Sequence, residues 1–118
     1  ETAEDYVELI AHLIATRGEA RTVDIAEHLG VSHVTVTKTL GRLRREGLIH
    51  TEPYRSIFLT DEGKLIAEQC AARHELVVRF LRQVGVGLAD AENDAEGIEH
   101  HLSEATLRAI QKFVESDR

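Results

Sequence analysis

Cysteine is almost absent from this sequence of 118 residues, since Cys70 is its one cysteine. This excludes an internal disulfide and any metal site built from several thiolates, and it favours a reducing compartment. Long apolar runs are also missing, because no stretch approaches the roughly 18 apolar residues that a membrane span requires. No charged segment followed by an apolar one opens the chain in the manner of a signal sequence. We predict a cytoplasmic protein that has no membrane partner.

Aromatic residues are scarce as well. Tryptophan is absent, and the chain holds two tyrosines and three phenylalanines. Leu, Ile, Val and Ala must therefore fill the core, which is typical of small helical proteins and predicts a mainly α fold. Such scattered rings also argue against an aromatic pocket for a small organic effector.

Positive charge is in short supply, since the net charge is -7. Residues 17–55 are the exception: they carry seven basic and five acidic side chains, and the acidity lies outside them. An asymmetry of this kind predicts two functions in one chain, with nucleic-acid binding in the basic segment.

Helices are expected in the N-terminal part where apolar residues recur at helical spacing. We predict them over residues 5–17, from Thr22 to Gly30 and from Ser32 to Gly47, with Thr22 and Ser32 as N-caps. The β-forming stretches 48–50 and 57–59 follow, which predicts a hairpin.

Residues 22–47 have the layout of a helix-turn-helix, and the hairpin adds a two-stranded wing, giving a winged helix-turn-helix. Threonine and lysine side chains on the outer face of the second of these helices can reach base edges and phosphates. An alternative is a three-helix bundle with a solvated basic face. The excess of two positive charges predicts weak, salt-sensitive binding by one copy, so two copies on a palindromic double-stranded DNA operator are expected. The candidate DNA contacts are Ser32, Val34, Thr35, Thr37, Lys38, Arg42 and Arg55.

The C-terminal part is predicted to be helical throughout. Thr60 opens a long helix that ends at Gly85, Asp90 caps a helix through His101, and Ser103 caps a last helix.

An acidic stretch without a basic residue, NDAEGIEHHLS, occupies residues 93–103. On one helix its Glu96, Glu99 and His100 stand at positions i, i+3 and i+4, which share a face. Because the stretch has no Lys or Arg, we predict that a divalent metal supplies the positive charge. A solvated helix face is the alternative.

Two further helices carry candidate ligands. Asp5 and Glu8 stand three residues apart in the first turn of the first helix, and His74 lies among the inner residues of the long helix. Taken alone, the acids have another explanation, because acidic residues are favoured near helix N-termini. Taken alone, His74 is explained as a hydrogen-bonded or half-exposed imidazole. Taken together, the three helices predict ligands that converge on one site.

The motifs EDYVELI, RHELVVRFL and NDAEGIEHHLS, together with the winged helix-turn-helix, resemble the manganese-responsive branch of the diphtheria toxin repressor family over nearly the whole chain. The resemblance implies a regulator rather than an enzyme: a homodimer that represses manganese-uptake genes. It implies a DNA-binding domain over residues 1–68 and metal-binding and dimerisation helices over residues 69–118. The SH3-like third domain of the iron-responsive branch has no counterpart here. The metal ligands that the resemblance implies are Asp5, Glu8, His74, Glu96, Glu99 and His100.

The ligand types favour manganese. Where the iron-responsive branch has a methionine and a cysteine, this chain has Asp5 and Glu96, and oxygen donors suit Mn²⁺. Four carboxylates and two neutral imidazoles carry four negative charges, which two divalent ions cancel, so we predict a binuclear site with two Mn²⁺ per chain. The alternatives are an Fe²⁺-responsive repressor of the same family and, from another class, a two-metal hydrolase, which requires an open coordination position.

Overall fold

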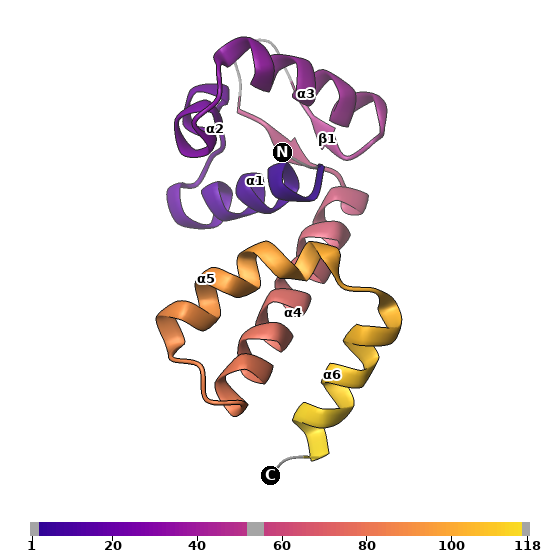
Figure 1. Ribbon diagram of the computed structural model, residues 1–118. Helices are drawn as coiled ribbons and strands as arrows, with labels where there is room; N and C mark the ends of the chain where they lie inside the picture. The colour runs from indigo at the N-terminus through magenta and orange to yellow at the C-terminus, as the bar shows by residue number, and fades with distance from the viewer. Residues whose placement is uncertain (1–2, 52–55, 117–118) are drawn as a thin grey trace. The chain divides into compact units, whose positions relative to one another are not determined.

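The computed structural model describes residues 3–51 and 56–116, and it divides the chain into two compact units, Glu1–Glu68 and Gln69–Arg118 (Figure 1). The fold is mainly α, as predicted. In chain order the elements are α1 (Ala3–Arg17), α2 (Thr22–Leu29), α3 (His33–Arg45), β1 (Ile49–His50), β2 (Phe58–Leu59), α4 (Asp61–Gln83), α5 (Leu88–Ile98), the 3-10 helix η1 (Glu99–His101) and α6 (Glu104–Ser116). The division between the units falls within α4.

Helices α2 and α3 form the helix-turn-helix of the first unit. Gly30 ends α2 with a φ of 68°, a left-handed conformation that glycine adopts at little cost. Ser32 caps α3, since its hydroxyl accepts a hydrogen bond of 3.1 Å from the Thr35 N–H. The prediction that Thr22 caps α2 is wrong, because Thr22 is the first helical residue and Arg21 occupies the N-cap without a side-chain hydrogen bond.

The predicted hairpin is present as an antiparallel pair in which Ile49 lies opposite Leu59. Ala20 adds a contact that the sequence did not suggest, because its carbonyl accepts a 2.8 Å hydrogen bond from the Ile57 N–H. The connection at residues 52–55, including the predicted DNA contact Arg55, lies outside the described residues.

The core of the first unit joins the three helices to the wing. Its members are buried, and most of them come from α1, α2, α3 and the two strands. The centre of this core consists of Val7, Ile10, Ile25, Val36 and Leu43, each fully buried. The burial of Val36 and Leu43 fixes which face of α3 turns inward, so the opposite face is left to solvent.

The second unit comprises the C-terminal part of α4 with α5, η1 and α6. Phe80 of α4 packs edge-on against Phe113 of α6, with ring centroids 5.6 Å apart. Thr60 caps α4 through a 3.1 Å hydrogen bond from the Gly63 N–H, and Ser103 caps α6 in the same way through the Thr106 N–H. Both helix starts were predicted, and Ser103 was predicted as a cap.

Helix α5 differs from its prediction at both ends. Gly87 occupies the N-cap position, so Asp90 lies inside the first turn and does not cap the helix. The α-helix ends at Ile98, and residues Glu99–His101 form a 3-10 turn where a continuous helix was expected. In the described part of the chain, no helix combines the length and the apolarity needed to cross a membrane.

Candidate functional site

A buried carboxylate, Glu99, stands where α5 gives way to η1. Ala91 and Ala95 precede it at intervals of four residues, and both are fully buried. Glu99 continues this inner ridge and is itself 1% exposed, the one charged side chain among the described residues that is so deeply buried. A buried carboxylate needs positive charge or hydrogen-bond donors to offset its loss of hydration.

The two oxygens of Glu99 face different partners. His100 Nε2 lies 3.4 Å from Glu99 Oε1, and Arg73 Nε of α4 lies 3.7 Å from Glu99 Oε2. The Arg73 side chain is 22% exposed and that of Glu99 is fully buried, so water screens this pair only from the arginine side. One edge of the carboxylate therefore meets an imidazole and the other a fixed cation.

Arg73 is a residue that the sequence analysis missed. The absence of Lys and Arg from residues 93–103 suggested that only a metal could balance their acids, yet a guanidinium from another helix contacts Glu99. A signal was present: Arg73 stands three residues after Cys70 and four before Val77, and both of these are fully buried. Helical spacing therefore placed Arg73 on the inner face of α4.

A second pair of candidate ligands meets between α4 and α5. His74 Nδ1 lies 3.5 Å from Glu96 Oε2, and the two side chains are 27% and 69% exposed. The pair is thus more open to solvent than the pair formed by Glu99 and His100.

Both pairs have a spacing suited to two adjacent ligands of one ion. Donors about 2.1 Å from an octahedral ion and at right angles to each other lie about 3 Å apart. The observed separations of 3.4 and 3.5 Å need only small side-chain adjustments to reach that value. Each pair joins an imidazole nitrogen to a carboxylate oxygen, so the four residues of the second unit fit a hard divalent ion.

Asp5 and Glu8 belong to the first unit. Both lie in the first two turns of α1, and both are partly buried. Their convergence with the four residues of the second unit stays a prediction.

The predicted DNA-reading face lies on α3, opposite its buried residues. Val34 is 63% exposed, an unusual position for a large apolar side chain. The nearby hydroxyls make internal contacts: Thr37 Oγ1 donates a 2.9 Å hydrogen bond to the His33 carbonyl, and Thr35 Oγ1 lies 2.9 Å from Ser32 Oγ. These hydroxyls are held in place and keep lone pairs for further hydrogen bonds.

The basic residues of this face differ in their partners. Arg42 Nε lies 3.7 Å from Glu46 Oε1, in a pair whose members are each about half exposed. Lys38 is exposed, and no ion pair of its ammonium group is present in the part of the chain that the structure describes. Glu46 therefore neutralises one of the cations that the sequence analysis assigned to DNA.

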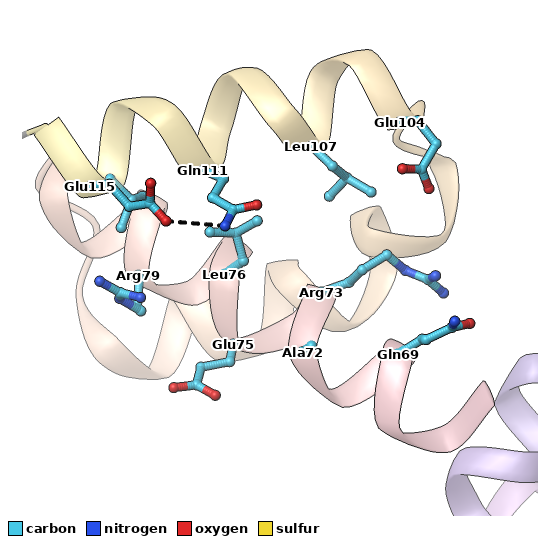
Figure 2. A pocket seen from close by; sticks show the side chains of 11 residues that line it. Gln69, Ala72, Arg73, Glu75, Leu76, Arg79, Glu104, Leu107, Gln111 and Glu115 are labelled. Atoms are coloured by element: carbon cyan, nitrogen blue, oxygen red, sulfur yellow. Dashed lines mark hydrogen bonds between the residues drawn. The ribbon is translucent and has the colours of Figure 1, made fainter. Parts of the chain in front are cut away.

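A groove of about 490 Å³ runs between α4 and α6 in the second unit (Figure 2). Leu76, Leu107 and Val114 are the large apolar residues that line it. Its charged members are the acids Glu75, Glu104 and Glu115 and the two arginines Arg73 and Arg79. Figure 2 shows the Arg73 side chain at the end of the groove where Glu104 lies.

Comparison with known proteins matches the two halves of the chain to the two parts of one family. Residues 1–57 match the model described as the iron dependent repressor, N-terminal DNA binding domain, and residues 60–117 match the iron dependent repressor, metal binding and dimerisation domain. The transcriptional regulator MntR of Escherichia coli O6:H1 is 50% identical over 115 residues, which are 98% of this chain and 74% of that protein.

Solved structures agree in fold. The crystal structure of T. acidophilum IdeR has a TM-score of 0.85 and 25% identity, covering 100% of this chain and 56% of that one. A manganese-dependent transcriptional repressor in complex with manganese has a TM-score of 0.85 and 27% identity, covering 97% of this chain and 53% of that one. The chain thus spans little more than half the length of these two structures.

Proposed function

The chain belongs to the iron-dependent repressor family, and from that premise we propose that it is a manganese-responsive repressor that binds DNA as a homodimer. In this proposal residues 1–68 form the winged helix-turn-helix that reads DNA. Residues 69–118 form the helices that bind metal and hold two copies together. Such a protein acts on the genome, which places it in the cytoplasm.

The observation that carries the proposal is the presence of two nitrogen–oxygen donor pairs within the second unit. His100 with Glu99, and His74 with Glu96, have separations of 3.4 and 3.5 Å, which suit two ligands of one ion. Two such pairs support a site for two ions. Oxygen and imidazole donors suit Mn²⁺, which has little preference for sulfur.

Asp5 and Glu8 complete the proposed ligand set from α1. Without a metal, their negative charges and that of Glu96 repel one another, so these acids do not fix α1. A bound divalent ion supplies the positive charge that lets these carboxylates share one site. The four acids then fix α1, and with it the DNA-binding unit, to the dimerisation helices.

The outer face of α3 makes the DNA contacts in this scheme. Val34 and Thr35 offer apolar and hydroxyl contacts to bases, and Lys38 offers a cation to guanine or phosphate. Because the local excess of basic charge is small, one copy binds weakly, and two copies fixed at the spacing of a palindromic operator bind well.

The test is a DNA-binding titration at fixed salt in excess Mn²⁺ and in chelator. Allosteric couplings of about 1 to 3 kcal/mol predict an operator affinity about 5- to 150-fold higher with Mn²⁺. Replacing Glu96, as Glu96→Gln, should remove most of this gain, whereas Glu92→Gln on the exposed face of α5 should not. Equal affinity of the unaltered protein in Mn²⁺ and chelator would refute the proposal.

Iron is the competing effector, because the family model carries the description of an iron-dependent repressor. The carboxylates at Asp5 and Glu96 favour manganese over the softer ion. The double variant Asp5→Met with Glu96→Cys should therefore shift the response from Mn²⁺ towards Fe²⁺. An unaltered protein that responds to Fe²⁺ and not to Mn²⁺ in the same titration, without oxygen, would establish the alternative.

A further inference from the structure

The Glu99 carboxylate is shared between a candidate metal ligand and a fixed cation. Its Oε1 faces His100 Nε2 at 3.4 Å, and its Oε2 faces Arg73 Nε at 3.7 Å. A carboxylate that binds one ion through Oε1 can keep Arg73 at Oε2. A carboxylate that bridges two ions needs Oε2 as well, and a guanidinium at that oxygen opposes the approach of a second positive charge.

Arg73 makes a contact within α4 and also borders a groove. Its Nη2 donates to Cys70 Sγ at 3.3 Å, a contact with a fully buried residue on the preceding turn of α4. The Arg73 side chain also borders the groove between α4 and α6, which Glu104 lines as well (Figure 2). The guanidinium therefore has space beside it and an acidic residue at the same end of the groove.

From this geometry we propose that Arg73 is an internal counter-cation: it neutralises Glu99 while metal is absent, and the ion that uses Glu99 Oε2 must displace it towards the groove. The inference rests on the proposed metal-binding function and adds to it a residue that is not a ligand. Arg73 stabilises the metal-free protein and weakens the binding of one of the two ions. It thereby raises the Mn²⁺ concentration at which the regulator responds.

Two properties of the Arg73→Gln variant should change in opposite directions. The metal-free variant should melt at a lower temperature, because buried Glu99 loses its cation. Its weaker Mn²⁺ site should bind about 10- to 100-fold more tightly, the range that corresponds to one contact between ionised groups. A guanidinium that merely holds Glu99 in position for the metal predicts weaker Mn²⁺ binding on its removal, so the sign of the change separates the two roles.

The experiment compares the unaltered chain, Arg73→Gln and Arg79→Gln by calorimetric titration with Mn²⁺ and by thermal melting in chelator. Arg79 is the matched control, since it lies on the same helix and lines the same groove, and no contact joins it to Glu99 among the described residues. Arg79→Gln should match the unaltered chain in both measurements.

Each result has a definite meaning. Unchanged or weaker Mn²⁺ binding by Arg73→Gln would overturn the inference while leaving the proposed function in place. No Mn²⁺ binding by the unaltered chain would overturn both. If Arg73→Gln does not fold, a crystal structure of the unaltered chain with Mn²⁺ decides the question: the inference expects Arg73 Nε to have left Glu99 Oε2, and a retained contact with both ions bound would refute it.

Discussion

Replacing the buried acid, as Glu99→Gln, is expected to destabilise the metal-free protein. Glutamine keeps the shape of the side chain but removes the charge that faces Arg73 at 3.7 Å. Two opposite unit charges about 4 Å apart attract each other with an energy of about 4 kcal/mol at an effective dielectric constant of 20. Part of this is recovered, because Arg73 is 22% exposed and gains hydration, and because a neutral amide costs less to bury than a carboxylate. We expect a net loss of about 1 to 3 kcal/mol, which lowers the melting midpoint by about 4 to 12 °C in a chain of this size.

The same substitution should reduce the stabilisation by Mn²⁺. Each ion that binds only the folded state contributes about 2.7 kcal/mol when its concentration is 100 times the dissociation constant. For this chain, that corresponds to a rise of about 10 °C in the midpoint for each ion. Because Glu99 contacts His100 within one donor pair, its loss should remove at least one such increment.

Thermal denaturation followed by circular dichroism, with chelator and with excess Mn²⁺, measures both effects on one sample. Glu92→Gln is the control, since it makes the same chemical change on α5 at an exposed position. A metal-free Glu99→Gln protein that melts above the unaltered chain would show that Arg73 does not compensate the burial of the carboxylate. A full Mn²⁺-induced rise in that variant would show that Glu99 is not a ligand.

Three further outcomes are expected. Zn²⁺ should bind but raise operator affinity less than Mn²⁺, because a tetrahedral ion leaves some of six ligands unused; full activation by Zn²⁺ in the DNA titration would contradict this. Ser32→Ala should lower the free energy of unfolding by about 1 kcal/mol, since the Thr35 N–H at the start of α3 loses its 3.1 Å acceptor; urea denaturation measures it, and an unchanged midpoint would refute it. Glu46→Gln should release Arg42 from its 3.7 Å pair and raise DNA affinity several-fold. The slope of log affinity against log salt concentration should become steeper by up to about one unit. A salt titration that gives the same slope for both proteins would show that Arg42 does not contact phosphate.

The sequence predicted the helix starts that depend on local hydrogen bonds. Ser32, Thr60 and Ser103 cap their helices because each hydroxyl reaches a backbone N–H three residues further on. The prediction that Thr22 caps α2 was wrong for a reason that is not local. Ala20 pairs with Ile57, a residue far along the chain, and this contact precedes an extended Arg21. Arg21 therefore takes the N-cap position, and the helix begins at Thr22, one residue earlier than a Thr22 cap requires.

Contacts among the candidate ligands were predictable within one segment and not between helices, and their role as ligands stays a prediction. The spacing of Glu96, Glu99 and His100 suggested a common face, and the last two do lie 3.4 Å apart. Their meeting with Arg73 and His74 depends on how α4 packs against α5 and η1. No local pattern in residues 93–103 carries that information, so the cation beside Glu99 came to light only in the structure.

The position of Arg73 also bears on how the centre treats soft metal ions. The chain has one cysteine and no methionine, so Cys70 holds its only sulfur atom. Cys70 precedes His74 by one helical turn, a spacing at which a thiolate and an imidazole can bind one ion, as they do in many zinc sites. Here the sulfur lies 3.3 Å from Arg73 Nη2, and a neighbouring positive charge opposes the approach of a metal ion. Arg73 contacts Glu99 through a different nitrogen, Nε. Arg73 can thus weaken the binding of a hard ion at Glu99. It also opposes the binding of soft metal ions, which compete with Mn²⁺, at Cys70.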